Sequence, residues 1–200
     1  TDAKRYAKLA ATESWMGKAQ TGHYQYYPFM NAGHFRMYDF VDAPLQKELA
    51  GYYREGIEAC VKMGKANPYR IGVPFIWCSN NLLVALVTQC FLYERMTGDA
   101  TFHEFATLQR DWLLGRNPWG FTMFTDIGSV YPKDPHLMTM QLTRRPVLGG
   151  LVDGPVYERI FKSLKRVPIS EPDPLAAFQG PADYHDDQQD YSSNEPTMDG

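Results

Sequence analysis

The sequence predicts an all-α protein built from helical hairpins, with long loops gathered between the helices. Apolar residues recur three and four positions apart in several stretches, which is the spacing of one face of a helix. The clearest stretch is 80–97, and the start signals of another helix follow directly after it. Only short β-like pieces such as 121–124 occur, so we expect at most short strands.

Composition supports a folded chain and excludes several classes of protein. The chain has 200 residues, of which 44% are hydrophobic and 22% charged, as expected for one domain, or at most two small ones, with a buried core. A net charge of −3 argues against a dedicated nucleic-acid binder. No apolar run of about 18 residues exists, so no membrane span is predicted. Cys60, Cys78 and Cys90 match neither a disulfide framework nor a zinc site, and Cys60 and Cys90 are predicted to be inert core thiols.

The N-terminal part is predicted to hold two helices separated by a long loop. Helical spacing covers 2–17 and 44–64, and Gly64 stands where glycine commonly ends a helix. The segment 18–42 is rich in aromatic residues and is predicted to be a loop. Loops of this length inside compact domains are often functional.

The central part is predicted to be an antiparallel pair of helices. Ser79 is a natural N-cap for 80–97, and Gly98 ends that helix. A capping box formed by Thr101 and Glu104 then starts a helix over 101–114. Two helices joined by so few residues must pack as antiparallel neighbours.

The C-terminal part is predicted to be mostly loop. Residues 116–154 contain Gly and Pro throughout, Pro155 suits the first turn of a helix through Lys165, and a last helix is expected near Asn194. The segment 171–200 carries eight acidic residues and no Lys or Arg. A solvated acidic tail is one interpretation, but the aromatic residues within this segment favour an ordered structure.

Two segments carry candidate chemistry. The stronger is 183–195, where crowded carboxylates raise one another's proton affinity, as a general acid near neutral pH requires. A calcium site is the competing interpretation, but the spacing differs from that of an EF-hand, so neither a metal nor another cofactor is predicted. The other candidate is His136, which lies in a loop without apolar periodicity. Taken alone, 77–81 and 113–120 are typical of a helix cap and a turn.

Four segments together resemble glycoside hydrolase family 9. Trp77-Cys78-Ser79-Asn80 is similar to that family's Trp-Gly-Ser-Asn segment, and Gly98-Asp99 to its Thr-Gly-Asp turn. The run 114–118 is similar to Leu-Gly-x-Asn-Pro, and 190–195 matches the C-terminal Asp-Tyr-x-x-Asn-Glu motif. Order and spacing agree over roughly 75–200 and less sharply over 1–74.

The resemblance implies the C-terminal portion of an (α/α)6 barrel, with residues 1–200 forming a single partial domain. It implies a cellulase-like glycosidase that cleaves β-glycosidic bonds of a β-1,4-glucan-like substrate with inversion. By that resemblance Glu195 is the general acid, and Asp187 and Asp190 are supporting carboxylates near the same subsites, where they are expected to raise the pKa of Glu195.

Sugar contacts are implied less directly. His136 stands where the family has a Pro-His-His-Arg segment, but the second His and the Arg are absent here, and Arg144 or Arg145 could replace the Arg. Tyr26, Trp119 and Tyr184 could stack on sugar rings or pack in the barrel wall. We expect His136, Trp119 and Glu195 to open onto one cleft.

The family's catalytic base belongs to an Asp-Ala-Gly-Asp segment, which this chain lacks. The sequence also starts within a helical pattern without Met, so we expect a fragment whose partner is the N-terminal half of the catalytic domain. Alone it should be neither active nor well folded. The resemblance implies a carbohydrate substrate and a secreted or periplasmic location.

The alternative is a non-catalytic glycan-binding relative that uses the aromatic segment 22–35 as a platform. The upstream sequence of the parent protein would distinguish the two, because only the hydrolase needs the base. The exact sugar and linkage, and endo or exo action, stay open.

Overall fold

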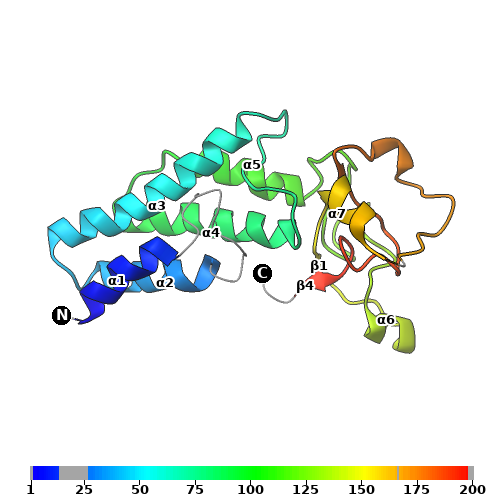
Figure 1. Ribbon diagram of the computed structural model, residues 1–200, viewed down its shortest axis with the longest axis horizontal. Coiled ribbons are helices and arrows are strands. Elements are labelled where there is room, and N and C mark those ends of the chain that lie inside the picture. The colour runs from blue at the N-terminus through cyan, green and yellow to red at the C-terminus, as the bar shows by residue number, and fades with distance from the viewer. Residues whose placement is uncertain (1, 14–26, 166, 198–200) are drawn as a thin grey trace. The chain divides into compact units, whose positions relative to one another are not determined.

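The computed structural model describes residues 2–13, 27–165 and 167–197 (Figure 1). Contacts within the chain divide it into two compact units. The helical unit comprises residues 1–72 and 84–109, and the loop unit comprises 73–83 and 110–200. The chain is mainly helical, and every strand that the structure describes is two residues long, as predicted from the sequence.

The longer helices are α1 (Asp2–Glu13), α2 (Tyr27–Tyr38), α3 (Ala43–Gly64), α4 (Ser79–Thr97) and α5 (His103–Leu113). Helices α1 and α2 lie side by side, and α2 also packs against α3 (Figure 1). Ala7, Leu45 and Leu49 are buried together at this contact. The predictions over 44–64 and over the start of 2–17 are thus confirmed, while 14–17 lies outside the described residues.

The prediction of a loop over 18–42 is wrong where the structure describes it. Residues 27–38 form α2, although 18–26 lies outside the described residues. Pro28 falls in the first turn, where proline is tolerated, and Gly33 costs the helix only about 1 kcal/mol relative to alanine. Tertiary contacts offset this cost, because His34 is buried and its Nε2 lies 2.9 Å from the Ala7 carbonyl oxygen.

The predicted pair of central helices is confirmed, with a different cap. Gly98 takes the left-handed conformation (φ 73°) between α4 and α5. The carboxylate of Asp99 accepts hydrogen bonds from the Thr101 hydroxyl and from the Thr101 N–H at 3.0 Å. Asp99 therefore orders this turn instead of the predicted Thr101–Glu104 box, and α5 begins later, at His103.

The loop unit contains two small antiparallel pairings. Strand β1 (Leu151–Val152) pairs with β4 (Pro196–Thr197), and β2 (Val156–Tyr157) pairs with β3 (Ala182–Asp183). The remaining elements are the short helices α6 (Met138–Thr143) and α7 (Glu158–Ser163) and a 3-10 turn, η2 (Ala176–Phe178).

These pairings correct two helix predictions. The helix expected from Pro155 begins only at Glu158, because the preceding residues pair with β3. No helix begins near Asn194 in the described residues, because the chain there enters β4. Pairing of β4 with β1 also shows that the acidic segment is ordered through residue 197, against the interpretation of a solvated tail.

The buried thiols behave as predicted. Cys60 and Cys90 are buried, and this burial raises the pKa of each to about 12, so both stay protonated at neutral pH. Within the described part of the chain, no helix is long and apolar enough to cross a membrane.

Two glycines of α3 give a matched test of packing. A Cβ on Gly64 would lie 2.6 Å from the Arg70 carbonyl oxygen, whereas a Cβ on Gly51 would meet nothing within 4 Å. In the intact protein, Gly64→Ala should lower the free energy of unfolding by about 1–3 kcal/mol. Gly51→Ala should raise it by about 0.5–1 kcal/mol through helix propensity. Denaturant unfolding measures both, and equal effects would contradict this role for Gly64.

Candidate functional site

The segment Trp77–Asn80 joins the start of α4 to β1. Ser79 Oγ donates to the Pro155 carbonyl at 2.8 Å, and Asn80 Nδ2 donates to the Val152 carbonyl at 2.7 Å. The Asn80 N–H donates to the Asp153 carbonyl at 2.9 Å. Gly154 (φ 88°) must be glycine, because a Cβ there would lie 2.4 Å from Asn80 Cγ. These bonds fix the position of β1, the partner of β4.

The backbone of Glu195 is fixed by the same contacts. Its carbonyl accepts a hydrogen bond from the Asp153 N–H at 2.8 Å, and Pro196 pairs with Val152. Its side chain is exposed, and no hydrogen bond holds its carboxylate among the described residues. A rigid backbone thus presents an exposed carboxylate, which is the arrangement of a group that must reach a ligand.

Asp190 is a structural centre of the acidic segment. It is fully buried, and its carboxylate accepts hydrogen bonds from both Ser192 (N–H 2.8 Å) and Ser193 (Oγ 2.7 Å), with His185 Nδ1 at 2.9 Å. Burial alone would raise its pKa, but the hydrogen bonds from His185, Ser192 and Ser193 outweigh burial and hold the pKa below its ordinary value. Asp190 therefore positions the turn that leads to Glu195.

Asp187 and Asp186 differ although they are neighbours. Asp187 is buried and accepts hydrogen bonds from the N–H groups of Ser170 (2.6 Å) and Gln189 (2.8 Å). Burial favours a higher pKa for Asp187, yet these bonds lower it, and the charge of Asp190 opposes them. Burial raises the pKa of Asp186. The predicted repulsion between carboxylates exists, but hydrogen bonds decide the result at Asp187.

His136 lies beside the segment that carries Glu195. Its N–H donates to the Asn194 carbonyl at 2.9 Å. Its Nδ1 contacts the Gln188 carbonyl, which can only accept, so Nδ1 carries the proton and the Nε2 of the neutral ring is an acceptor. The structure therefore ties His136 to the residue directly before Glu195.

Two further rings join His136 in an aromatic row. The ring of Tyr191 packs against His136, with centroids 6.1 Å apart, and stacks on Trp77 at 6.0 Å. All three side chains are partly exposed. Sequence reasoning did not select Trp77 or Tyr191 as site residues, although both lie in the two segments with the sharpest motifs.

Trp119 and Tyr184, which could stack on sugar or pack in the barrel wall, are both buried. Tyr184 is fully buried against Trp119 and Phe121, and its hydroxyl donates to Asn194 Oδ1. Trp119 is 7% exposed, packs on Trp112, and donates from Nε1 to Gln179 at 3.2 Å. Their ring faces are covered by protein, so they support the site from within, and Trp119 does not share an open cleft with His136. Tyr26 lies outside the described residues.

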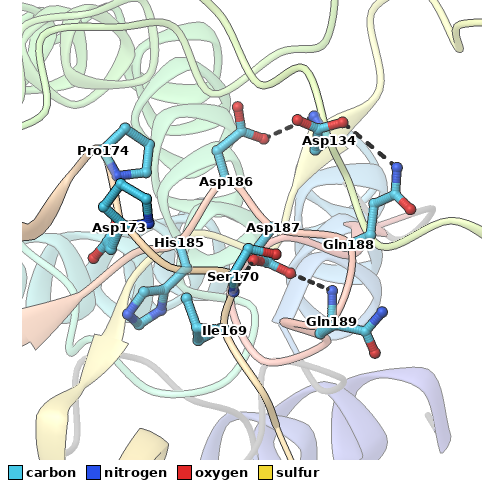
Figure 2. A pocket seen from close by; sticks show the side chains of 11 residues that line it. Asp134, Ile169, Ser170, Asp173, Pro174, His185, Asp186, Asp187, Gln188 and Gln189 are labelled. Atoms are coloured by element: carbon cyan, nitrogen blue, oxygen red, sulfur yellow. Dashed lines mark hydrogen bonds between the residues drawn. The ribbon is translucent and has the colours of Figure 1, made fainter.

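A pocket of about 360 Å³ lies over the acidic segment (Figure 2). His185 and four carboxylates line it, those of Asp134, Asp173, Asp186 and Asp187. Figure 2 shows Asp187 bonded to Gln189, and Asp134 bonded to both Asp186 and Gln188. In the described ranges no three His, Cys, Asp or Glu side chains converge as metal ligands.

Comparison with known proteins identifies the family. The model of glycosyl hydrolase family 9 matches residues 1–200, so the chain belongs to that family. No curated protein matches the sequence.

Several solved structures share the fold. The family 9 endoglucanase J30 is 24% identical and matches 99% of this chain and 37% of its own, with a TM-score of 0.70. A metagenome-derived family 9 endoglucanase is 22% identical and matches 100% of this chain and 38% of its own, with a TM-score of 0.68. AaCel9A, in complex with a cellobiose-like isofagomine, is 21% identical. The match covers 96% of this chain and 36% of the AaCel9A chain, with a TM-score of 0.66.

The chain thus spans little more than a third of the length of these structures. Its fold is part of the (α/α)6 barrel of family 9, which confirms the predicted fold class.

The buried carboxylate of Asp190 predicts a pH-dependent contribution to stability. Because the fold lowers its pKa below 3.8, its contribution is present above that pH and is lost as the pH falls through the lower pKa of the folded state. Asp190→Asn should therefore cost about 2 kcal/mol or more at pH 7. The cost should shrink below pH 3.8.

Denaturant unfolding of the intact protein at several pH values measures this cost. Asp39→Asn, at an exposed site, is the control and should cost little at any pH. A cost for Asp190→Asn that does not change with pH would contradict the assignment.

Proposed function

We propose that the intact protein containing this chain hydrolyses β-glycosidic bonds of a β-1,4-glucan-like carbohydrate, with Glu195 as the general acid. The observation that carries the proposal is the contrast at Glu195 between a backbone fixed by Asp153 and an exposed carboxylate. Family membership supports it, as do two similar structures described as endoglucanases and a third bound to a cellobiose-like compound.

The proposed mechanism needs two carboxyl groups. Glu195 protonates the leaving oxygen, and a second carboxylate activates water on the other face of the sugar, about 6.5–9.5 Å away in an inverting enzyme. We propose that this base comes from the remaining N-terminal half of the catalytic domain. His136 accepts a sugar hydroxyl at Nε2 and thereby orients the ring against Glu195, with no metal or other cofactor taking part.

In this proposal, the supporting residues do not contact the sugar. Asp190 and Asp187 hold the backbone that leads to Glu195, because their oxygens already accept hydrogen bonds from the protein. The hydroxyl of the buried Tyr184 holds the Asn194 side chain through a hydrogen bond. A secreted or periplasmic location, where polysaccharides are met, is part of the same proposal.

The alternative of a non-catalytic glycan binder receives less support. Its platform was the aromatic segment 22–35, of which 27–35 belongs to helix α2 and 22–26 lies outside the described residues. The partly exposed row of Trp77, Tyr191 and His136 would serve either function. Only the hydrolase requires the carboxyl of Glu195.

Glu195→Gln in the intact protein tests the proposal. The change keeps the shape but removes the transferable proton, so turnover of an unactivated β-glucan should fall by roughly 10²–10⁴-fold. A glycosyl fluoride needs little protonation of its leaving group and should lose much less. Steady-state rates on the two substrates give the comparison.

Glu104→Gln, at an exposed helix position in α5, is the matched control and should leave both rates unchanged. Equal losses on both substrates, or no loss on either, would assign the acid role to another carboxylate. If the wild-type protein bound the glycan but did not hydrolyse it, the non-catalytic alternative would be favoured.

A further inference from the structure

A second pocket of the loop unit is strongly basic. Its volume is about 450 Å³, and Lys133, Arg144, Arg145 and Gln188 are among the residues that line it. The lining includes three cationic side chains and no carboxylate. These three residues are exposed, and their side chains form no ion pair with any described residue. Charges of one sign gathered in a concave site attract an oppositely charged ligand.

The backbone brings the two arginines to this pocket at a conformational cost. Helix α6 ends at Arg144, which adopts the left-handed conformation (φ 55°) while its N–H donates to the Met140 carbonyl at 2.8 Å. A residue other than glycine reaches this conformation only at the expense of free energy. This hydrogen bond is a usual way for a left-handed residue to end a helix, and the chain that leaves α6 places Arg144 and Arg145 together in the lining of the pocket.

The basic pocket adjoins the site proposed for sugar binding. Gln188 lines it, and the carbonyl of Gln188 accepts the hydrogen bond of His136 Nδ1. Gln188 also lines the acidic pocket of Figure 2. An anionic group near Gln188 is therefore repelled from one side and attracted to the other, which fixes the direction in which it points.

We propose that the basic pocket binds an anionic group carried by the glycan, so that the enzyme prefers an acidic β-glucan over a neutral one. Arginine suits this ligand because its planar fork donates two parallel hydrogen bonds to a carboxylate or a sulfate. The inference rests on the proposed function, since it places the anionic sugar beside the residue that orients the substrate.

The test compares two matched oligosaccharides in the intact protein. One is a neutral cello-oligosaccharide, and the other is the same chain with one glucose oxidised at C6 to a carboxylate. Wild-type kcat/KM should be higher for the acidic chain, and the double variant Arg144→Gln/Arg145→Gln should lower it about 10-fold for that chain alone. Because the pair is exposed, raising the salt from about 0.02 to 0.5 M should remove most of the preference.

Arg116→Gln is the control, because it removes an exposed arginine of the same unit that does not line this pocket. Its kcat/KM should match the wild type on both chains. Equal losses on the acidic and neutral chains, or the same loss in Arg116→Gln, would overturn the inference. An unchanged melting temperature for the double variant shows that it is folded.

Direct binding separates this inference from the proposed function. Calorimetry with Glu195→Gln protein should show tighter binding of the acidic chain than of the neutral chain, whether or not the wild type hydrolyses either. A sulfated chain should also bind more tightly than the neutral one. Inorganic sulfate that binds as tightly as the acidic chain would show a site for a free anion and would overturn the inference. Absence of hydrolysis with preserved acidic preference would overturn only the proposed function.

Discussion

The geometry of the loop unit depends on the hydrogen bonds that join the start of α4 to the segment 152–155. Ser79 and Asn80 hold three carbonyl groups of that segment, and Gly154 leaves the space in which the Asn80 side chain lies. Because Val152 of this segment pairs with β4, the first residues of α4 determine where Glu195 stands. Each bond contributes about 1 kcal/mol, but losing a buried partner costs more, since an unsatisfied polar group is left inside the protein. The sequence predicts Ser79 as the N-cap of this helix, but the structure includes Ser79 in α4 and uses its hydroxyl to position the site.

The acidic segment shows how one residue type takes three roles. Asp190 is ionised and enclosed by donors, Asp187 receives two backbone N–H groups, and Asp186 is buried enough for its pKa to rise. Glu195 differs from all of them in having an exposed carboxylate on a fixed backbone. Ionised groups that are fully hydrogen-bonded stabilise a turn, whereas a group with open coordination can act on a ligand. The environment, and not the number of carboxylates, separates structure from function here.

Periodicity predicted the helices whose apolar stripe is regular, and it failed where tertiary contacts dominate. Helices over 44–64 and 80–97 carry such stripes, whereas α2 has little amphipathic character and is held through the buried His34. The general acid candidate was recognised through its motif, because no local feature of the sequence distinguishes Glu195 from nearby carboxylates. The burial of Trp119 and Tyr184 could not be predicted, because an aromatic residue in a loop gives the same sequence pattern whether its ring faces solvent or the core. The row formed by Trp77 and Tyr191 joins segments more than a hundred residues apart, which no local pattern reveals.

One dipeptide separates the two charged pockets. The N–H groups of Lys133 and Asp134 both donate to the carboxylate of Asp186, which fixes the backbone between the pockets. The Lys133 side chain then lines the basic pocket, while the Asp134 side chain lines the acidic one. Opposite charges on adjacent residues are thus divided between two pockets, one lined by cations and the other by carboxylates. A charged ligand that meets both pockets is attracted by one and repelled by the other, so this division favours one orientation of such a ligand.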